Sequence, residues 1–193
     1  MKPFVAVVAL LVLAAQAAPR GAGQNRPADC PKANVIAKMV SAMQPFRDAQ
    51  PLDRTHLKAC GAQLSKDGKE LSVCLANGDF AIADMANSFV LPLKQKGQFI
   101  LQINFANGAG IVPGTYDPAA GYGKPFWASG EVKVAIGDKG TIVMLGAGEG
   151  TAEIIAMSGS TVCGRFRLKT AAGHPQPSEV AGEFNVPLER SRW

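Results

Sequence analysis

Short runs of alternating apolar and polar residues, separated by glycine-containing turns, occupy most of the chain from residue 57 onward. A period of two places successive side chains on opposite faces of a β-strand. About nine such strands at short, regular spacing predict an antiparallel β-sandwich or a flattened barrel. The runs that predict strands are 57–64, 71–75, 80–82, 89–93, 99–105, 131–136, 141–145, 151–157, 161–168 and 179–188.

One hairpin also fixes which residues face each other. Asp67-Gly68 between two strand-like runs is a strong signal for a tight turn. If these two residues form the turn, Cys60 lies opposite Leu75. It is then one position away from Cys74 and points to the other face of the sheet.

One segment near the N-terminus follows a helical period instead. Its apolar residues recur at the spacing of a helix face: Val35, Ile36, Met39, Val40 and Met43. Asn34 can cap the start, and Pro45 ends the pattern. We therefore predict one amphipathic helix over residues 34–44, with its apolar stripe packed on the main domain.

The first 17 residues have the features of a secretory signal peptide. Lys2 gives a positive start, an apolar run extends from Phe4 to Ala15, and a small-residue site allows cleavage before Ala18. The run is shorter than the roughly 20 residues that a spanning helix needs. We expect a protein exported to the periplasm or medium, with no integral membrane segment after signal removal.

The part after the signal has the length of one domain. Residues 18–33 are rich in glycine, proline and arginine without periodicity, which predicts a flexible leader. We expect a single β-sandwich domain over residues 34–190, with the predicted helix at its start.

All four cysteines follow the predicted signal: Cys30, Cys60, Cys74 and Cys163. An even number in an exported chain predicts two disulfides, and no C-x-x-C pair suggests metal ligation. Three connectivities are open. Because Cys60 and Cys74 are expected on opposite faces, we favour Cys30 with Cys60 and Cys74 with Cys163.

The formal net charge of +5 is small, and one of these charges, Lys2, leaves with the signal. Nucleic-acid binders concentrate basic residues on one stripe, which this chain does not do. We expect no nucleic-acid partner, only a modest preference for anionic surfaces.

No catalytic or cofactor motif is convincing. The glycines of 146–150 resemble a dinucleotide-binding loop, but the third comes one residue early and 152–157 is too short for the required helix. His56 and His174 have no spacing to further metal ligands. We expect no cofactor and no metal.

Two strands near the C-terminus repeat the spacing Val-x-Gly-x-Phe, at 162–166 and 180–184. In adjacent strands, such a glycine makes room for a large ring. The pair resembles the terminal hairpin of uncharacterised exported bacterial β-sandwich domains. The resemblance covers about a fifth of the chain and implies no known activity.

The segment 107–130 shows neither period, and long irregular loops in compact domains often bind ligands. Aromatic faces and orienting charges would suit a protein, peptide or glycan ligand. Alternatively, Phe126 and Trp127 begin a strand and Tyr116 fixes the loop. The candidate ligand-binding residues are Tyr116, Asp117, Tyr122, Lys124, Phe126 and Trp127.

A second candidate surface is the outward row Arg165, Arg167 and Lys169, which either binds an anion or only protects the sheet. The main functional hypothesis is a non-enzymatic binding module that uses the aromatic loop. The alternative is a small exported hydrolase or isomerase whose carboxylates are assembled by the fold. A third is an envelope protein that binds its own kind.

Overall fold

The computed structural model describes most of the predicted domain. The described residues are 29–41, 53, 55–85, 93, 95, 97–136, 139–144, 148–175 and 177–191. The predicted signal peptide, the leader before residue 29 and the predicted strand 89–93, apart from Leu93, lie outside them.

The described residues form ten strands, one short α-helix and one 3₁₀ turn, which confirms the mainly-β prediction. The helix α1 covers Ile82–Met85 and the turn η2 covers Pro118–Ala120. The strands are β1 (Val35–Ser41), β2 (Ala59–Leu64), β3 (Glu70–Ala76), β4 (Phe99–Ala106), β5 (Gly114–Tyr116), β6 (Trp127–Ile136), β7 (Lys139–Met144), β8 (Glu149–Met157), β9 (Thr161–Lys169) and β10 (Ser178–Arg190).

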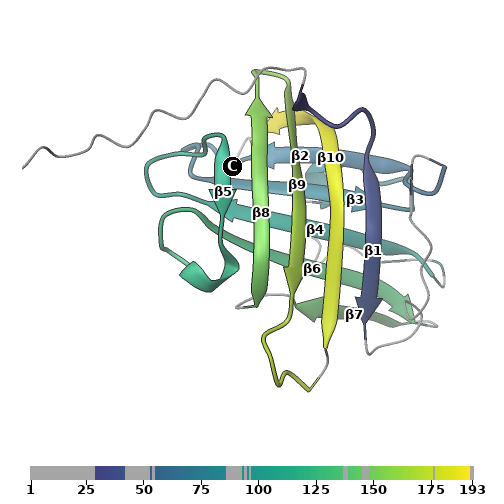
Figure 1. The fold of residues 1–193 in the computed structure, drawn as a ribbon. Coiled ribbons are helices and arrows are strands. Elements are labelled where there is room, and N and C mark those ends of the chain that lie inside the picture. Colours follow the sequence, from purple (N-terminus) through teal and green to yellow (C-terminus); the bar gives the residue numbers. More distant parts are fainter. Residues whose placement is uncertain are drawn as a thin grey trace, which may run out of the picture.

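The strands make two layers that cross each other (Figure 1). The front layer holds β5, β8, β9, β10 and β1, and the back layer holds β2, β3, β4, β6 and β7. Nine strands follow one continuous path, in the order β5-β8-β9-β10-β2-β3-β4-β6-β7, so the sheet is nearly closed into a barrel. The large core lies between the layers, with Phe105, Phe166 and Phe184 among its buried members.

β10 joins the two layers. From Glu179 to Pro187 it pairs antiparallel with β9, and its last residues, Leu188–Arg190, pair in parallel with β2. Its first half also pairs with β1 on the other edge. One strand therefore hydrogen-bonds to both layers and to the N-terminal segment.

The helix predicted over residues 34–44 is wrong, because Val35–Ser41 forms β1. Ile36 pairs with Gly182, but the next paired residue is Lys38, so Ala37 is an extra residue in a β-bulge. The bulge turns Ile36 and Met39 to the same buried face. A bulged strand thus produces the i, i+3 spacing that normally indicates a helix.

Two further elements differ from the expectation. The predicted strand 80–82 is replaced by a loop and α1, whose Ile82 packs with Phe80 against a second small cluster on the outer face of the back layer. Within the predicted loop 107–130, three residues form β5 and β6 begins already at Trp127. Eight of the ten described strands were thus predicted, whereas β1, β5 and the contacts outside the main core were not.

The hairpin register is confirmed. Cys60 pairs with Leu75, and Gly61 with Cys74, as the Asp67-Gly68 turn requires. Gly68 has a φ of +73°, in the left-handed region that glycine adopts easily.

The glycine and phenylalanine positions of β9 and β10 interlock. Gly164 pairs with Phe184, and Gly182 with Phe166. A Cβ on Gly182 would lie 2.8 Å from Cζ of Phe166 and would also meet the carbonyl oxygen of Val35. Glycine is therefore required where β10 is enclosed by a ring on one strand and by the backbone of another.

Gly182→Ala should destabilise the fold by about 2–3 kcal/mol, because β10 is paired on both sides and cannot shift to relieve the overlap. Gly159→Ala is the matched control, since a Cβ there meets no atom within 4 Å. It should change stability by less than about 0.5 kcal/mol. Urea unfolding of both variants checks this, and equal stabilities would contradict the packing described for β10.

The structure contains a disulfide between Cys30 and Cys163, whose Cα atoms are 5.7 Å apart. Cys60 and Cys74 are free thiols. The predicted pairs Cys30–Cys60 and Cys74–Cys163 are therefore wrong. Their premise was sound, since Cys60 packs against the main core and Cys74 belongs to the cluster on the outer face of the back layer.

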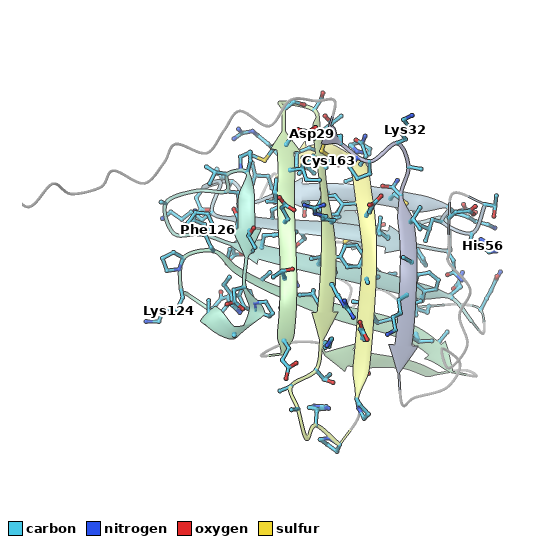
Figure 2. The ribbon with its side chains drawn as sticks, viewed as in Figure 1. Asp29, Lys32, His56, Lys124, Phe126 and Cys163 are labelled. Carbon is cyan, nitrogen blue, oxygen red and sulfur yellow. A yellow bond between two sulfur atoms is a disulfide. The ribbon has the colours of Figure 1, made fainter. Side chains whose placement is uncertain are left out.

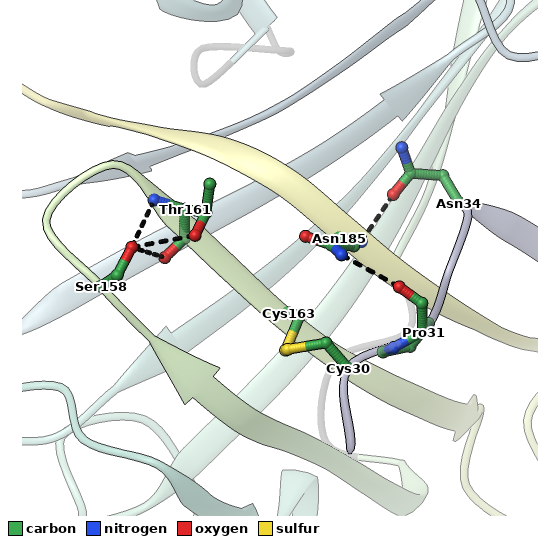
Figure 3. The surroundings of a disulfide bond; sticks show 7 residues. All are labelled: Cys30, Pro31, Asn34, Ser158, Thr161, Cys163 and Asn185. Atoms are coloured by element: carbon green, nitrogen blue, oxygen red, sulfur yellow. Dashed lines mark hydrogen bonds between the residues drawn. A yellow bond between two sulfur atoms is a disulfide. The ribbon is translucent and has the colours of Figure 1, made fainter. Parts of the chain in front are cut away.

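Asn185 brings Cys30 to Cys163 (Figure 3). It pairs with Cys163 across β9 and β10. Its side-chain Nδ2 donates to the carbonyl of Pro31 at 2.9 Å, and its backbone N–H donates to Oδ1 of Asn34 at 2.7 Å. The segment that precedes β1 is thus fastened beside β10, which sequence reasoning missed because it assigned that segment to a leader and a helix.

Thiol labelling followed by non-reducing peptide mapping should find one linked pair, Cys30 with Cys163. Cys60 and Cys74 should react fully only after unfolding, because burial raises the pKa of Cys60 to about 11 and also raises that of Cys74. The bridge spans 133 residues, and its loss should cost about 5 kcal/mol by the chain-entropy estimate. A peptide linking Cys74 to Cys163 would overturn this assignment.

Candidate functional site

The predicted aromatic loop is closed at its base by backbone hydrogen bonds. The N–H of Asp117 donates to the carbonyl of Phe126 at 2.8 Å, and that of Ala128 donates to the carbonyl of Asp117 at 3.4 Å. The Asp117 carboxylate accepts from the N–H of Ala119 at 2.7 Å and caps η2. Asp117 therefore shapes the loop through its own backbone contacts.

Tyr116 lies in the core and presents no face to a ligand. Its side chain is fully buried, and its ring meets that of Phe105 edge-on at 5.1 Å. Its hydroxyl donates to the carbonyl of Val112 at 2.8 Å. Burial raises the pKa of Tyr116, so the hydroxyl remains a protonated donor. Its role is to fix the loop, as the alternative interpretation expected.

Phe126 and Lys124 lie near β5 at one side of the molecule, far from His56 at the opposite side (Figure 2). Phe126 is partly exposed, and its ring lies 5.3 Å from that of Tyr116. Its φ of +54° is unusual for a residue with a side chain. The ring covers the base of the loop, whereas Lys124 is exposed at its tip.

Tyr122 and Trp127 form an exposed aromatic corner. Their ring centroids are 5.2 Å apart and the planes meet at 84°. Tyr122 is 75% exposed, which is far above the usual exposure of an aromatic side chain. The flanking Gly121 and Gly123 both have a φ of +82°, a conformation that lets the chain turn sharply on either side of the ring.

The floor beside this corner comes from the outer face of the back layer. Glu70, Ala106 and Trp127 lie in one register row across β3, β4 and β6. The small Ala106 between two large side chains leaves a hollow of about 160 Å³, which Tyr122 borders. The Tyr122 hydroxyl donates to Oε1 of Glu70 at 3.4 Å, across this hollow.

A polar row lies next to that floor. Ser72 and Asn104 are paired and also line the hollow. Oδ1 of Asn104 accepts from Oγ of Ser72 at 2.8 Å and from Nε2 of Gln102 at 2.7 Å. These bonds fix the orientation of the amide, so the hollow has a preset polar wall.

A second hollow of about 190 Å³ also borders Tyr122 and shares Glu70 and Ala106 with the first, but it is lined by Lys124 where the first is lined by Trp127. Its walls are the β2–β3 turn and the turn that follows β4. The backbone N–H of Ile111 donates to the carbonyl of Gly68 at 2.8 Å and links the two turns. We call the two hollows the aromatic groove. Its lining residues include Asp67, Lys69, Glu70, Ser72, Asn104, Ala106, Asn107, Tyr122, Lys124 and Trp127.

Three of the six candidate residues thus line the groove: Tyr122, Lys124 and Trp127. Sequence reasoning missed its polar half. Ser72 and Asn104 are outward positions of the predicted strands 71–75 and 99–105, and Glu70 directly precedes the first of them. Only the pairing of β3 with β4 brings these residues beside the loop. In the sequence, only the alternation of polar and apolar residues indicated that these side chains point away from the core.

The cationic row Arg165, Arg167 and Lys169 faces carboxylates. Nε of Arg165 donates to Glu153 at 2.6 Å, and Nε of Arg167 donates to Glu179 at 2.9 Å.

The surroundings of this row are balanced in charge. The hydrogen bond from Lys38 holds the pKa of Glu179 below its usual value, and Arg167 lowers it further. The open trough above this row, about 690 Å³, is lined by Glu153 and Glu183 as well as by the arginines. Within the lining of the trough, Arg165 and Arg167 are matched by Glu153 and Glu183, so the lining carries no excess positive charge for an anion.

A buried charged pair lies elsewhere on the back layer. Glu131 and Lys133 on β6 are 2% and 7% exposed. Burial lowers the pKa of Lys133, while the nearby charge of Glu131 opposes that shift. Neither residue lines the aromatic groove.

Other candidate chemistry is sparse in the described part of the chain. His56 and Thr55 both form hydrogen bonds with the Asp53 carboxylate. The bonds from Thr55 lower the pKa of Asp53 to about 2. No group of three or more histidine, cysteine or acidic side chains that could hold a metal occurs among the described residues. Within the same residues, no helix has the length and apolar character needed to span a membrane.

Comparisons with protein families, with curated proteins and with solved structures return no match to this chain.

Proposed function

We propose that the protein is an exported, non-enzymatic binding module that holds an envelope or extracellular ligand in the aromatic groove. The observation that carries the proposal is Tyr122, which is 75% exposed yet held in place by contacts with Trp127 and Glu70. An ordered aromatic ring above a preset hollow binds a ligand at low entropic cost.

Export is supported by two features. The first 17 residues match a signal peptide, and the Cys30–Cys163 disulfide suits an oxidising compartment. The periplasm and the external medium both meet this requirement.

A binding role agrees better with the acids of the groove than a hydrolytic one. Hydrogen bonds from Ser65 and from the Lys69 N–H lower the pKa of Asp67, which keeps this carboxylate charged. A general acid needs the opposite shift. Asp67 is therefore poorly suited to act as a general acid and remains a charged hydrogen-bond acceptor in the groove.

Capture from the envelope and medium of cells that produce the protein tests the proposal. The immobilised mature protein is compared with a Tyr122→Ala, Trp127→Ala double variant, and bound proteins and sugars are identified. At least one component should fall about tenfold or more with the double variant, because removal of central aromatic contacts usually weakens binding strongly.

Val112→Ala is the matched control, since Val112 is also exposed but lies outside the groove. It should retain everything that the native protein retains. Ala106→Leu, which fills the floor without removing a ring, guards against a folding defect of the double variant. Identical components for all four proteins would refute a role for the groove.

A further inference from the structure

The shape of the aromatic groove favours an elongated ligand built of ring-sized units. Its two hollows, about 160 and 190 Å³, share Glu70, Ala106 and Tyr122. Each is smaller than the roughly 300–1,000 Å³ that encloses a drug-sized ligand. A ligand that fills both therefore places one small unit toward Trp127 and one toward Lys124, with the Tyr122 ring bordering both.

The lining of the groove combines flat apolar faces with hydrogen-bonding groups. Tyr122 and Trp127 present perpendicular rings, so a ring-shaped unit can stack on one while its edge meets the other. The carboxylate of Glu70, the hydroxyl of Ser72 and the ammonium of Lys124 surround these rings. A pyranose has the matching surface, with C–H bonds on its faces and hydroxyls around its rim.

The strands beneath the groove offer no free edge to which an extended peptide could add. β3 pairs with β2 and β4, and β4 pairs with β3 and β6. A peptide that adds to a sheet needs an unpaired strand edge. Because both strands of the floor are interior, their main chains are already used, and recognition must come from side chains.

The charges of the groove favour a neutral ligand. Asp67 and Glu70 are balanced by Lys69 and Lys124. A polyanion is attracted by the two lysines but repelled by the two acids, and for a polycation the signs are reversed. A neutral ligand whose hydrogen-bond donors and acceptors alternate can form hydrogen bonds with all four charged side chains.

We infer that the aromatic groove binds a neutral, β-linked glycan chain, with consecutive sugar units in the two hollows that the Tyr122 ring borders. This inference rests on the proposed binding function of the groove. The β-linked gluco-type chain is preferred because its hydroxyls are equatorial and leave both ring faces apolar for stacking.

Fluorescence titration with defined oligosaccharides tests the inference. The chain has two tryptophans, so a Trp193→Phe background makes Trp127 in the groove the only indole. Cellotetraose and chitotetraose should shift the emission of Trp127 in a saturable manner. Tetragalacturonate, which is anionic, and a neutral tetrapeptide should bind at least about tenfold more weakly.

The variants locate the binding. Tyr122→Ala and Ala106→Leu should each weaken it about tenfold or more, because one removes the stacking face and the other fills the floor. Tyr122→Phe keeps the ring and loses only the hydroxyl contact with Glu70, so it should bind within about threefold of the native protein. Val112→Ala should bind like the native protein.

Three results would overturn the inference: no response to either neutral glycan at millimolar concentration, tighter binding of the tetragalacturonate or the peptide, or equal binding by all variants. These outcomes are separable from failure of the proposed function. If capture still depends on the Tyr122 and Trp127 rings while neutral glycans do not bind, the groove binds another class of ligand. If capture does not depend on these rings, the proposed function fails with the inference.

Discussion

The fold depends on the hydrogen bonding of one strand. β10 pairs with β9 along most of its length and with β1 over its first half, and then passes to β2 with residues Leu188–Arg190, so it carries the sheet from the front layer to the back layer. Gly182 lets β1 and β9 pack closely on either side of β10, because a larger residue there would strike Val35 and Phe166. The same strand holds Asn185, which fastens the disulfide-bearing segment before β1. Closure of the barrel, the position of β1 and the formation of the disulfide thus all depend on contacts of β10.

The groove is a consequence of the same architecture. The outer face of the back layer forms the floor of the groove, and the loop that follows β5 places Tyr122 beside it. Tyr116 anchors that loop inside the core, while Tyr122 is presented outward above Ala106. The two tyrosines of the chain therefore have opposite roles, one structural and one exposed. Without an ordered base, the aromatic corner of Tyr122 and Trp127 would lose much of its binding energy to entropy.

Local patterns predicted most strands, because a period of two and an Asp-Gly turn depend only on neighbouring residues. The repeated Val-x-Gly-x-Phe spacing pointed to glycines that make room for rings, but the pairing of Gly182 with Phe166 comes from the structure. Contacts between distant segments were not foreseen. The bulge at Ala37 gave β1 the apolar spacing of a helix, so the segment was predicted as a helix. Because of this error, the contact between Cys30 and Cys163 was not predicted. For the same reason, the sequence indicated the aromatic half of the groove but not the polar half that β3 and β4 supply.

Assignment of backbone contacts by nuclear magnetic resonance tests the role of β10 most directly. The account predicts nuclear Overhauser contacts between backbone protons of Ile36 and Gly182, and between those of Leu64 and Arg190. The first pair reports on β1 and the second on the passage between layers. A helical pattern of sequential contacts over residues 34–44, with neither long-range contact present, would contradict it.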